Sequence, residues 1–378
     1  MKKRVLITYA TAGIGHKKAA FAVKAAFEEL SPNDVEVVIM DALDYTSAFF
    51  KWSYLQFYLL MVNKFPLLWG ISYYITDNFF LNIVISKLRT FSNRLNAQKL
   101  NRYLMEWKPD VVISTHFFAS EVVASLKASK ALKAHLITVV TDYRLHSWWV
   151  CEPTDIYVVG SDDAMADLVR WGVSAERVKV LGLPTEPIFG KDMDKSKVLE
   201  KLALDKGLFT VLVIGGGFGV GPIEEIVRSI SGSALDMQIV VVCGHNETLA
   251  GKLRELSKGT QKKVKVLGFV NDVYDYMEAA DLLISKSGGI TVAESLAKRL
   301  PMMVISPILG QETRNSDFLT SRGAAVEIKN IQDLKGVLED LMRDPSKLAK
   351  MKGAIEKIRR PSAAYDVARY AAYICSIT

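Results

Sequence analysis

Short apolar segments recur along the whole chain, and helical stretches of about ten residues separate several of them. Strands that alternate with helices in this way form parallel sheets, because the chain must cross the sheet between two parallel strands and usually does so as a helix. The segments are apolar throughout, as expected of strands that are covered on both faces. The sequence therefore predicts an α/β fold.

The alternation runs through the chain twice, and 378 residues are enough for two domains. We expect strands at about 5–9, 35–40, 111–114, 136–140, 156–159 and 178–181, and then at 209–214, 238–243, 263–267, 282–285, 302–305 and 324–328. A charged stretch without a strand separates the two series, with a linker near 184–192. Two such series predict two Rossmann-like domains, 1–186 and 187–358, that face a cleft lined by the carboxyl ends of the strands. The last residues, 359–378, predict a helix that packs on the first domain.

Composition narrows the class of protein. A net charge of +7 suits contact with phosphates or anionic surfaces and does not demand nucleic acid. Three scattered cysteines give no disulfide framework or zinc spacing, and favour a reducing compartment. No window of eighteen apolar residues predicts a transmembrane helix. Gly13 and Gly15 interrupt the apolar start, which therefore predicts a strand and a loop rather than a signal peptide.

One segment breaks the alternation. Thirteen aromatic residues lie between Tyr45 and Phe80, with few charged residues among them, and basic residues follow from Lys87 to Arg102. Apolar, aromatic helices flanked by cations suit the interface of a bilayer. The alternative is a helical insertion, about 45–105, that packs into the core or into a dimer interface. The candidate membrane or acceptor contacts are Trp52, Phe57, Tyr58 and Trp69, with Trp148 further along.

The loop after the strand 282–285 predicts an anion site. Ser287, Gly288 and Gly289 lead into a helix whose first amide groups could bind a diphosphate. Glu294, one turn into this helix, could accept hydrogen bonds from the hydroxyls of a ribose. The alternative is an ordinary helix cap beside a solvated glutamate.

The glycine-rich loop 215–221 is a second phosphate candidate. It follows the strand 209–214 and leads to Pro222, a residue that suits the first position of a helix. No Lys-Ser or Lys-Thr pair follows the loop, and no acidic residue ends the next strand. Both ATP hydrolysis and NAD binding are therefore disfavoured, and a structural turn is the alternative.

The first sheet has its own candidate site. His16 lies where the Gly13–Gly15 loop becomes a helix, and imidazole can accept a proton near neutral pH. His116, Asp142 and His146 also follow strands of this sheet, so we expect them to converge with His16. A helix-capping role is the alternative for His16, and the spacing of these residues does not support a metal site.

Five motifs stand out: the Gly-x-Gly-His loop, the VTD-to-Trp148 stretch, the glycine loop, SKSGGITVAES and GQETRN. Together they resemble those of the monogalactosyldiacylglycerol synthase and processive diacylglycerol glucosyltransferase group of family 28 glycosyltransferases. The resemblance runs nearly end to end. It implies a GT-B fold, a UDP-sugar donor, inversion at the anomeric carbon and no obligatory metal or other cofactor. Thr11 and Ala12 precede Gly13, where plant-type members have a more glycine-rich loop.

The resemblance also implies roles for single residues. His16 would be the base, with Asp142 as the other candidate; Phe269 and Val270 would meet the uracil through their backbone, and Glu294 would bind the ribose. The implied diphosphate contacts are Gly216, Gly217, Phe218, Gly219, Ser287, Gly288 and Gly289. The implied sugar contacts are Gln311, Glu312 and Asn315, and Gly15, Thr291 and Gly310 complete the donor-binding set.

From these residues we expect a peripheral enzyme on the cytoplasmic face of the cell membrane. It would transfer glucose or galactose from a UDP-hexose to diacylglycerol on an anionic membrane surface and form a β-glycosyl diacylglycerol, with no nucleic acid involved. Glucose is the preferred sugar. The alternatives are an N-acetylglucosamine transferase with a polyprenyl-linked acceptor and a non-catalytic UDP-sugar sensor.

Overall fold

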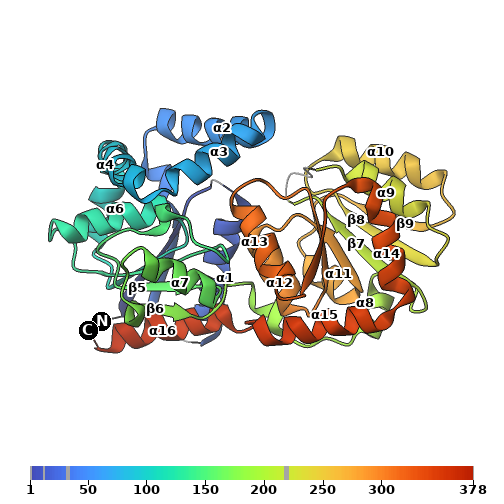
Figure 1. Cartoon of the computed structure of the whole chain (residues 1–378). Helices are drawn as coiled ribbons and strands as arrows, with labels where there is room; N and C mark the ends of the chain where they lie inside the picture. Colours follow the sequence, from blue (N-terminus) through green and yellow to red (C-terminus); the bar gives the residue numbers. More distant parts are fainter. Residues whose placement is uncertain (1, 12, 31–34, 217–220, 378) are drawn as a thin grey trace. The chain divides into compact units, whose positions relative to one another are not determined.

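The computed structural model describes residues 2–11, 13–30, 35–216 and 221–377. They form two compact units, each built on a parallel six-stranded sheet (Figure 1). The first unit comprises Met1–Pro187, Ile308–Arg314 and Arg360–Thr378, and the second comprises Ile188–Pro307 and Asn315–Arg359. The α/β class and the two parallel sheets predicted from the sequence are confirmed.

The sheet of the first unit has the strand order β2-β1-β3-β4-β5-β6. Its strands are β1 (Lys3–Tyr9), β2 (Val35–Asp41), β3 (Val111–Ser114), β4 (His135–Val139), β5 (Ile156–Val159) and β6 (Val178–Val180). Its helices are α1 (Ile14–Leu30), α2 (Ala48–Lys64), α3 (Pro66–Thr76), α4 (Phe79–Asn96), α5 (Gln98–Trp107), α6 (Phe117–Ala128), α7 (Asp162–Arg170) and α16 (Ala363–Ile377). The residues of β3 are buried on both faces, which explains why the strand is apolar without alternation.

The C-terminal helix α16 packs on α1 and on the first sheet, as the sequence predicted (Figure 1). Ala364, Val367, Ala368 and Ala371 are buried, and their spacing places them on one face of the helix. They join Val23 and Phe27 of α1 in one hydrophobic cluster. Small side chains at these positions allow the two helices to lie close together.

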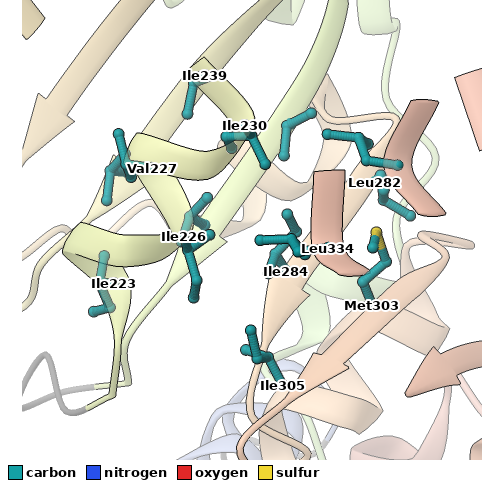
Figure 2. Close-up of a cluster of buried hydrophobic side chains, with 14 of the residues drawn as sticks. Ile223, Ile226, Val227, Ile230, Ile239, Leu282, Ile284, Met303, Ile305 and Leu334 are labelled. Carbon is teal, nitrogen blue, oxygen red and sulfur yellow. The ribbon is translucent and has the colours of Figure 1, made fainter. Parts of the chain in front are cut away.

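The sheet of the second unit has the order β12-β11-β10-β7-β8-β9. Its strands are β7 (Phe209–Ile214), β8 (Met237–Val242), β9 (Lys263–Leu267), β10 (Leu282–Ser285), β11 (Met302–Ile305) and β12 (Ala325–Ile328). Its helices are α8 (Lys195–Lys201), α9 (Ile223–Ser231), α10 (Glu247–Lys258), α11 (Val273–Ala279), α12 (Gly289–Ala297), α14 (Leu334–Arg343) and α15 (Pro345–Ile358), while α13 (Gln311–Thr320) has its first turn in the first unit. Figure 2 shows Ile226, Val227 and Ile230 of α9 packed with Ile284 and Leu334 in the core of the second unit.

One local expectation changes, and one is confirmed. Pro222 immediately precedes α9 and occupies the cap position rather than the first helical position. The segment without strands after Tyr45 folds into the helices α2, α3 and α4. No helix in the described part of the chain combines the length and the hydropathy that a membrane span requires.

Candidate functional site

Each sheet reverses its strand order at one place. In the first sheet, the chain passes from β1 to β2 on one side and from β3 to β4 on the other side. In the second sheet, it likewise passes from β7 to β8 on one side and from β10 to β11 on the other. The loops that follow such a pair of strands diverge and leave a crevice at their carboxyl ends. The loop with Gly13 and Gly15 follows β1, and the loop with Ser287 follows β10. Both candidate sites therefore lie where parallel sheets bind ligands.

His16 lies in the first turn of α1 and is held by two threonines. Its Nδ1 lies 2.8 Å from the carbonyl oxygen of Thr115 and 3.0 Å from the Oγ1 of Thr141. The Oγ1 of Thr115 in turn donates a hydrogen bond to the carbonyl of His16 at 2.9 Å. Because a carbonyl oxygen can only accept, Nδ1 carries the proton. The lone pair of the neutral ring is therefore on Nε2.

The surroundings keep His16 neutral at physiological pH. Its ring is partly covered, and burial lowers the pKa of His16 from 6.5 to about 4, although the hydrogen bond to Thr115 opposes this shift. A neutral imidazole with a free Nε2 can accept a proton from a hydroxyl group. The arrangement therefore suits a general base.

His116 has the role that the sequence left open for His16, because it caps a helix. Its Nδ1 accepts a hydrogen bond from the amide of Phe118 at 3.0 Å at the start of α6. The ring is almost fully buried and meets the ring of His16 edge to face, with the ring centres 4.5 Å apart. Burial lowers the pKa of His116 well below 6.5, and the neighbouring His16 adds to this.

The expected convergence is confirmed for His16 and His116. His146 interacts with the insertion: its Nε2 lies 2.9 Å from the carbonyl oxygen of Tyr73, and the two ring centres are 4.3 Å apart. Asp142 is near enough to Tyr73 to affect it: burial raises the pKa of the Tyr73 hydroxyl, Arg314 opposes this, and the charge on Asp142 adds to it. The structure thus joins His16 with His116 and associates Asp142 and His146 with Tyr73. A catalytic role for Asp142 stays a prediction.

The loop after β10 presents the start of α12. Gly288 is the cap residue of that helix and has no side chain with which to cap its first amide groups. Ser287 is fully buried, and its carbonyl oxygen accepts a hydrogen bond of 3.0 Å from Nδ2 of Asn315. Uncapped amides and the helix dipole favour an anion at this position. Asn315 therefore supports this loop, and its contact with a sugar stays a prediction.

Glu294 is only 4% exposed, so the alternative of a solvated glutamate is wrong. It lies in α12, like Thr291, and its predicted contact with a ribose is untested. Gly216, after β7, has a φ of +68°, a value that favours glycine. Gly217, Phe218 and Gly219 lie outside the described residues, so their predicted contacts with a diphosphate remain predictions.

An aromatic pair lies beyond the ends of β8 and β9. The rings of His245 and Phe269 are stacked, with centres 4.4 Å apart and an interplanar angle of 10°. Phe269 is 52% exposed, and Val270 follows it. Phe269 and Val270 could be predicted from the family resemblance, whereas a role for His245 was not predicted. The CGH sequence after β8 was its only signal.

The segment Ile308–Arg314 packs within the first unit. Glu312 folds back so that its carboxylate accepts a hydrogen bond from the amide of Ile308 at 2.7 Å. Among the described residues, the Oε1 of Gln311 is buried without a hydrogen-bond partner. An acceptor of this kind suits a ligand hydroxyl, because a buried oxygen without a donor is costly. The segment also contains Gly310, whose φ is +103°.

The aromatic insertion exposes a large apolar surface. On α2, Phe49 is 76% exposed, Trp52 is 60% exposed and Phe57 is 61% exposed. Trp69 and Trp148 are only half-buried, whereas Tyr73 is buried. The side chain of Tyr58 lies outside the described residues. Among the basic residues that follow, Lys99 and Arg102 are exposed, but Arg89 is paired with the buried Glu121 at 2.8 Å and is not available to a surface.

Comparisons with known proteins cover nearly the whole chain. Residues 16–185 match the family model of monogalactosyldiacylglycerol (MGDG) synthase, and residues 210–367 match the glycosyltransferase family 28 C-terminal domain. The processive diacylglycerol beta-glucosyltransferase of Bacillus cereus is 30% identical over 364 residues, which are 96% of this chain and 91% of the relative. The enzyme of the same name from Bacillus cytotoxicus is 29% identical over 96% of this chain and 92% of its own length.

Solved structures share the fold at low identity. Acinetobacter baumannii MurG has a TM-score of 0.63 and 16% identity, over 98% of this chain and 99% of its own. The UDP complex of S. aureus MnaA has a TM-score of 0.65 and 16% identity, over 100% and 98% of the two chains. Anabaena HepE in complex with UDP-glucose has a TM-score of 0.56 and 15% identity, over 99% and 98%. Together with the two parallel sheets, these neighbours confirm the GT-B fold class.

Proposed function

The chain belongs to the monogalactosyldiacylglycerol synthase and processive diacylglycerol beta-glucosyltransferase group of family 28 glycosyltransferases, and from this premise we propose that it transfers glucose from UDP-glucose to diacylglycerol and forms a β-glucosyl diacylglycerol. It is a UDP-sugar-dependent glycosyltransferase. The acceptor and the sugar follow the named activity of its relatives, which are glucosyltransferases acting on diacylglycerol. The observation that carries the proposal is the neutral His16, with its lone pair on Nε2, at the switch point of the first sheet.

The proposed chemistry uses the ring of His16 and the amide groups at the start of α12. Nε2 of His16 takes the proton of the diacylglycerol hydroxyl as its oxygen attacks the anomeric carbon. The bond from that carbon to the oxygen of the β-phosphate breaks, and its electron pair leaves with UDP. Amide groups at the start of α12 would stabilise the charge that develops on the diphosphate. Attack from the face opposite the leaving group inverts an α-linked donor into a β-linked product.

We assign the acceptor's surface to the exposed face of the insertion. The helix α2 is apolar on all sides: Phe50, Tyr54 and Met61 pack inward, while Phe49 and Trp52 face outward. A helix of this kind normally has all its faces covered. A lipid surface would cover the outer face, and exposed cations of α5 such as Lys99 and Arg102, which follow the insertion in sequence, would favour anionic lipids. On this proposal the enzyme is peripheral, on the cytoplasmic face of the membrane.

We also propose that transfer needs no metal ion, because amide groups and a helix dipole can neutralise the leaving diphosphate. Incubation with EDTA should therefore leave the rate of glycolipid formation within about twofold of the untreated rate. Restoration of a lost rate by Mg²⁺ or Mn²⁺, but not by Ca²⁺, would contradict this assignment.

Product analysis tests the proposal as a whole. Purified protein is incubated with vesicles of diacylglycerol and anionic phospholipid and with UDP-glucose, UDP-galactose or UDP-N-acetylglucosamine, and the lipid extract is separated and identified. We expect a glucosyl diacylglycerol as the main product. A galactolipid would correct the sugar. In a parallel incubation with a polyprenyl-linked acceptor, transfer to that acceptor and not to diacylglycerol would overturn the proposed acceptor. Release of no glycolipid from any donor would support a sugar-nucleotide sensor instead.

A further inference from the structure

The helix α3 has two different faces. Leu67, Ile71 and Ile75 are at least half exposed, whereas Gly70 and Tyr73 are buried on the other side. Asp77 is the cap residue at the carboxyl end of α3. The buried side of α3 therefore packs against protein while the other side remains open.

The buried side of α3 meets the segment Ile308–Arg314 at two glycines. A Cβ on Gly70 would lie 2.7 Å from the Cβ of Leu309, and a Cβ on Gly310 would lie 2.7 Å from the ring of Tyr73. Cβ atoms cannot approach this closely, so glycine is required at both contacts. The close approach fixes the path of the segment immediately before Gln311 and Glu312.

Arg314 ties the end of the same segment to the same helix. Its guanidinium donates to the carboxylate of Asp77 at 2.6 Å and to the carbonyl oxygen of Leu145 at 2.6 Å. The guanidinium also lies over the rings of Tyr73 and Tyr74, 5.1 Å and 5.5 Å from their centres. Only a planar guanidinium can make these contacts together, because lysine has a single charged nitrogen.

Asp77 is fixed from its other side. Its second oxygen accepts a hydrogen bond from the amide of Ser147 at 2.7 Å, and both Asp77 and Arg314 are largely covered, with side chains 14% and 20% exposed. If Arg314 moved away from Asp77, each charge would remain desolvated without its partner. Separating the two side chains is therefore unfavourable. The pair therefore holds the first turn of α13 in one orientation.

We propose that Arg314 is a positioning residue for donor recognition: clamped by Asp77 and Tyr73, it holds Gln311 and Glu312 in the conformation that receives the sugar of UDP-glucose. The inference rests on the proposed function and on the sugar contacts that the family resemblance implies for these two residues. The buried Oε1 of Gln311, without a partner among the described residues, supports it, because the clamp then holds an acceptor ready for a sugar hydroxyl. UDP itself lacks that sugar, so its binding does not depend on the clamp.

The difference between UDP-glucose and UDP makes the proposal testable by equilibrium binding to the full-length protein. We expect Arg314→Lys and Asp77→Asn each to weaken UDP-glucose binding about tenfold, the effect of one lost charged hydrogen bond, with UDP binding unchanged. In steady-state kinetics, KM for UDP-glucose should rise more than kcat falls. Arg322→Lys is the matched control. Arg322 follows the end of α13 and lies over the ring of Phe318, so this variant should change neither affinity.

Arg314→Lys and Asp77→Asn change the two partners of the same ion pair. Measuring the melting temperature and the UDP affinity of each variant separates a loss of positioning from misfolding. Equal loss of UDP and UDP-glucose affinity in both variants would overturn the proposal, as would wild-type values for both ligands. A wild-type protein that forms no glycolipid and binds UDP-glucose no differently from UDP would instead refute the proposed function.

Discussion

At the scale of single residues, hydrogen bonds divide three histidines of the first unit among three tasks. His116 uses Nδ1 to cap α6, His146 contacts the backbone of Tyr73, and His16 donates from Nδ1 to Thr115 and keeps Nε2 free. All three have a lowered pKa, chiefly because of burial. The chemistry of each ring is therefore set by its partners and not by its residue type.

The lowered histidine pKa values predict that acid destabilises the fold. In the unfolded chain His16 and His146 bind protons below about pH 6.5. In the folded protein their pKa is about 4, so they bind protons only in more acidic solution. The free energy of unfolding should therefore fall as the pH drops from 6.5 toward 4, with up to about 1.4 kcal/mol per pH unit from each group. Urea unfolding at pH 7, 6 and 5 measures this slope.

His116→Asn isolates one contribution to that slope. Asparagine can still cap α6 but does not titrate. Between pH 6.5 and 5 the slope of the unfolding free energy against pH should therefore decrease by the contribution of one proton, up to about 1.4 kcal/mol per pH unit. Identical slopes in the variant and the wild type would show that His116 is not held neutral in the folded state.

Glu294 carries a second prediction at this scale. If its carboxylate binds the ribose, Glu294→Gln should weaken UDP binding about tenfold or more, because a charged hydrogen-bond acceptor becomes a neutral one. Titration calorimetry measures the affinity, and Glu255→Gln on the exposed surface of α10 is the control. The ribose assignment fails if both variants bind UDP like the wild type.

At the scale of elements, the insertion helices serve two surfaces at once. The inward face of α2 completes a core cluster, and the inward face of α3 holds the segment with Gln311. Their outward faces are apolar. Periodicity could not separate these faces in the sequence, because α2 is apolar on every side.

The outward face of α2 predicts the membrane contact. The triple variant Phe49→Ser, Trp52→Ser and Phe57→Ser should move the protein from the vesicle pellet to the supernatant in sedimentation with anionic vesicles, because it removes most of the exposed aromatic area. UDP affinity should be unchanged. Tyr373→Ser, which removes an exposed ring from α16, should leave sedimentation as in the wild type.

A triple variant that still sediments with vesicles at the wild-type level would refute the lipid assignment. If the variant instead dissociates a dimer in analytical ultracentrifugation, the outward face is an interface between two copies of the chain.

At the scale of the whole molecule, the sequence was enough to predict the two sheets and the returning C-terminal helix. Buried parallel strands are short, apolar and separated by helices, so they can be identified from local sequence alone. Six of the twelve strands begin and end where the sequence placed them: β3, β5, β7, β9, β10 and β11. In β1, hydrogen bonding extends the ladder beyond the apolar residues to Lys3, whereas β6 and β12 are each one residue shorter than predicted.

The candidate site was less predictable. His16 and the loop with Ser287 could be found because they follow strands at a switch point. Thr115 and Thr141, which set the protonated nitrogen of His16, gave no local signal. The contacts of Arg314 with Asp77 join residues that are 237 positions apart, and no local pattern reports such a pair.

Single-turnover glucosyl transfer over diacylglycerol vesicles tests whether His16 removes the proton of the lipid hydroxyl while UDP departs. At saturating UDP-glucose, His16→Gln should form glycolipid about 100-fold more slowly than the wild type, or slower still, while UDP-glucose affinity stays within about twofold. A variant that transfers glucose at the wild-type rate would contradict the account.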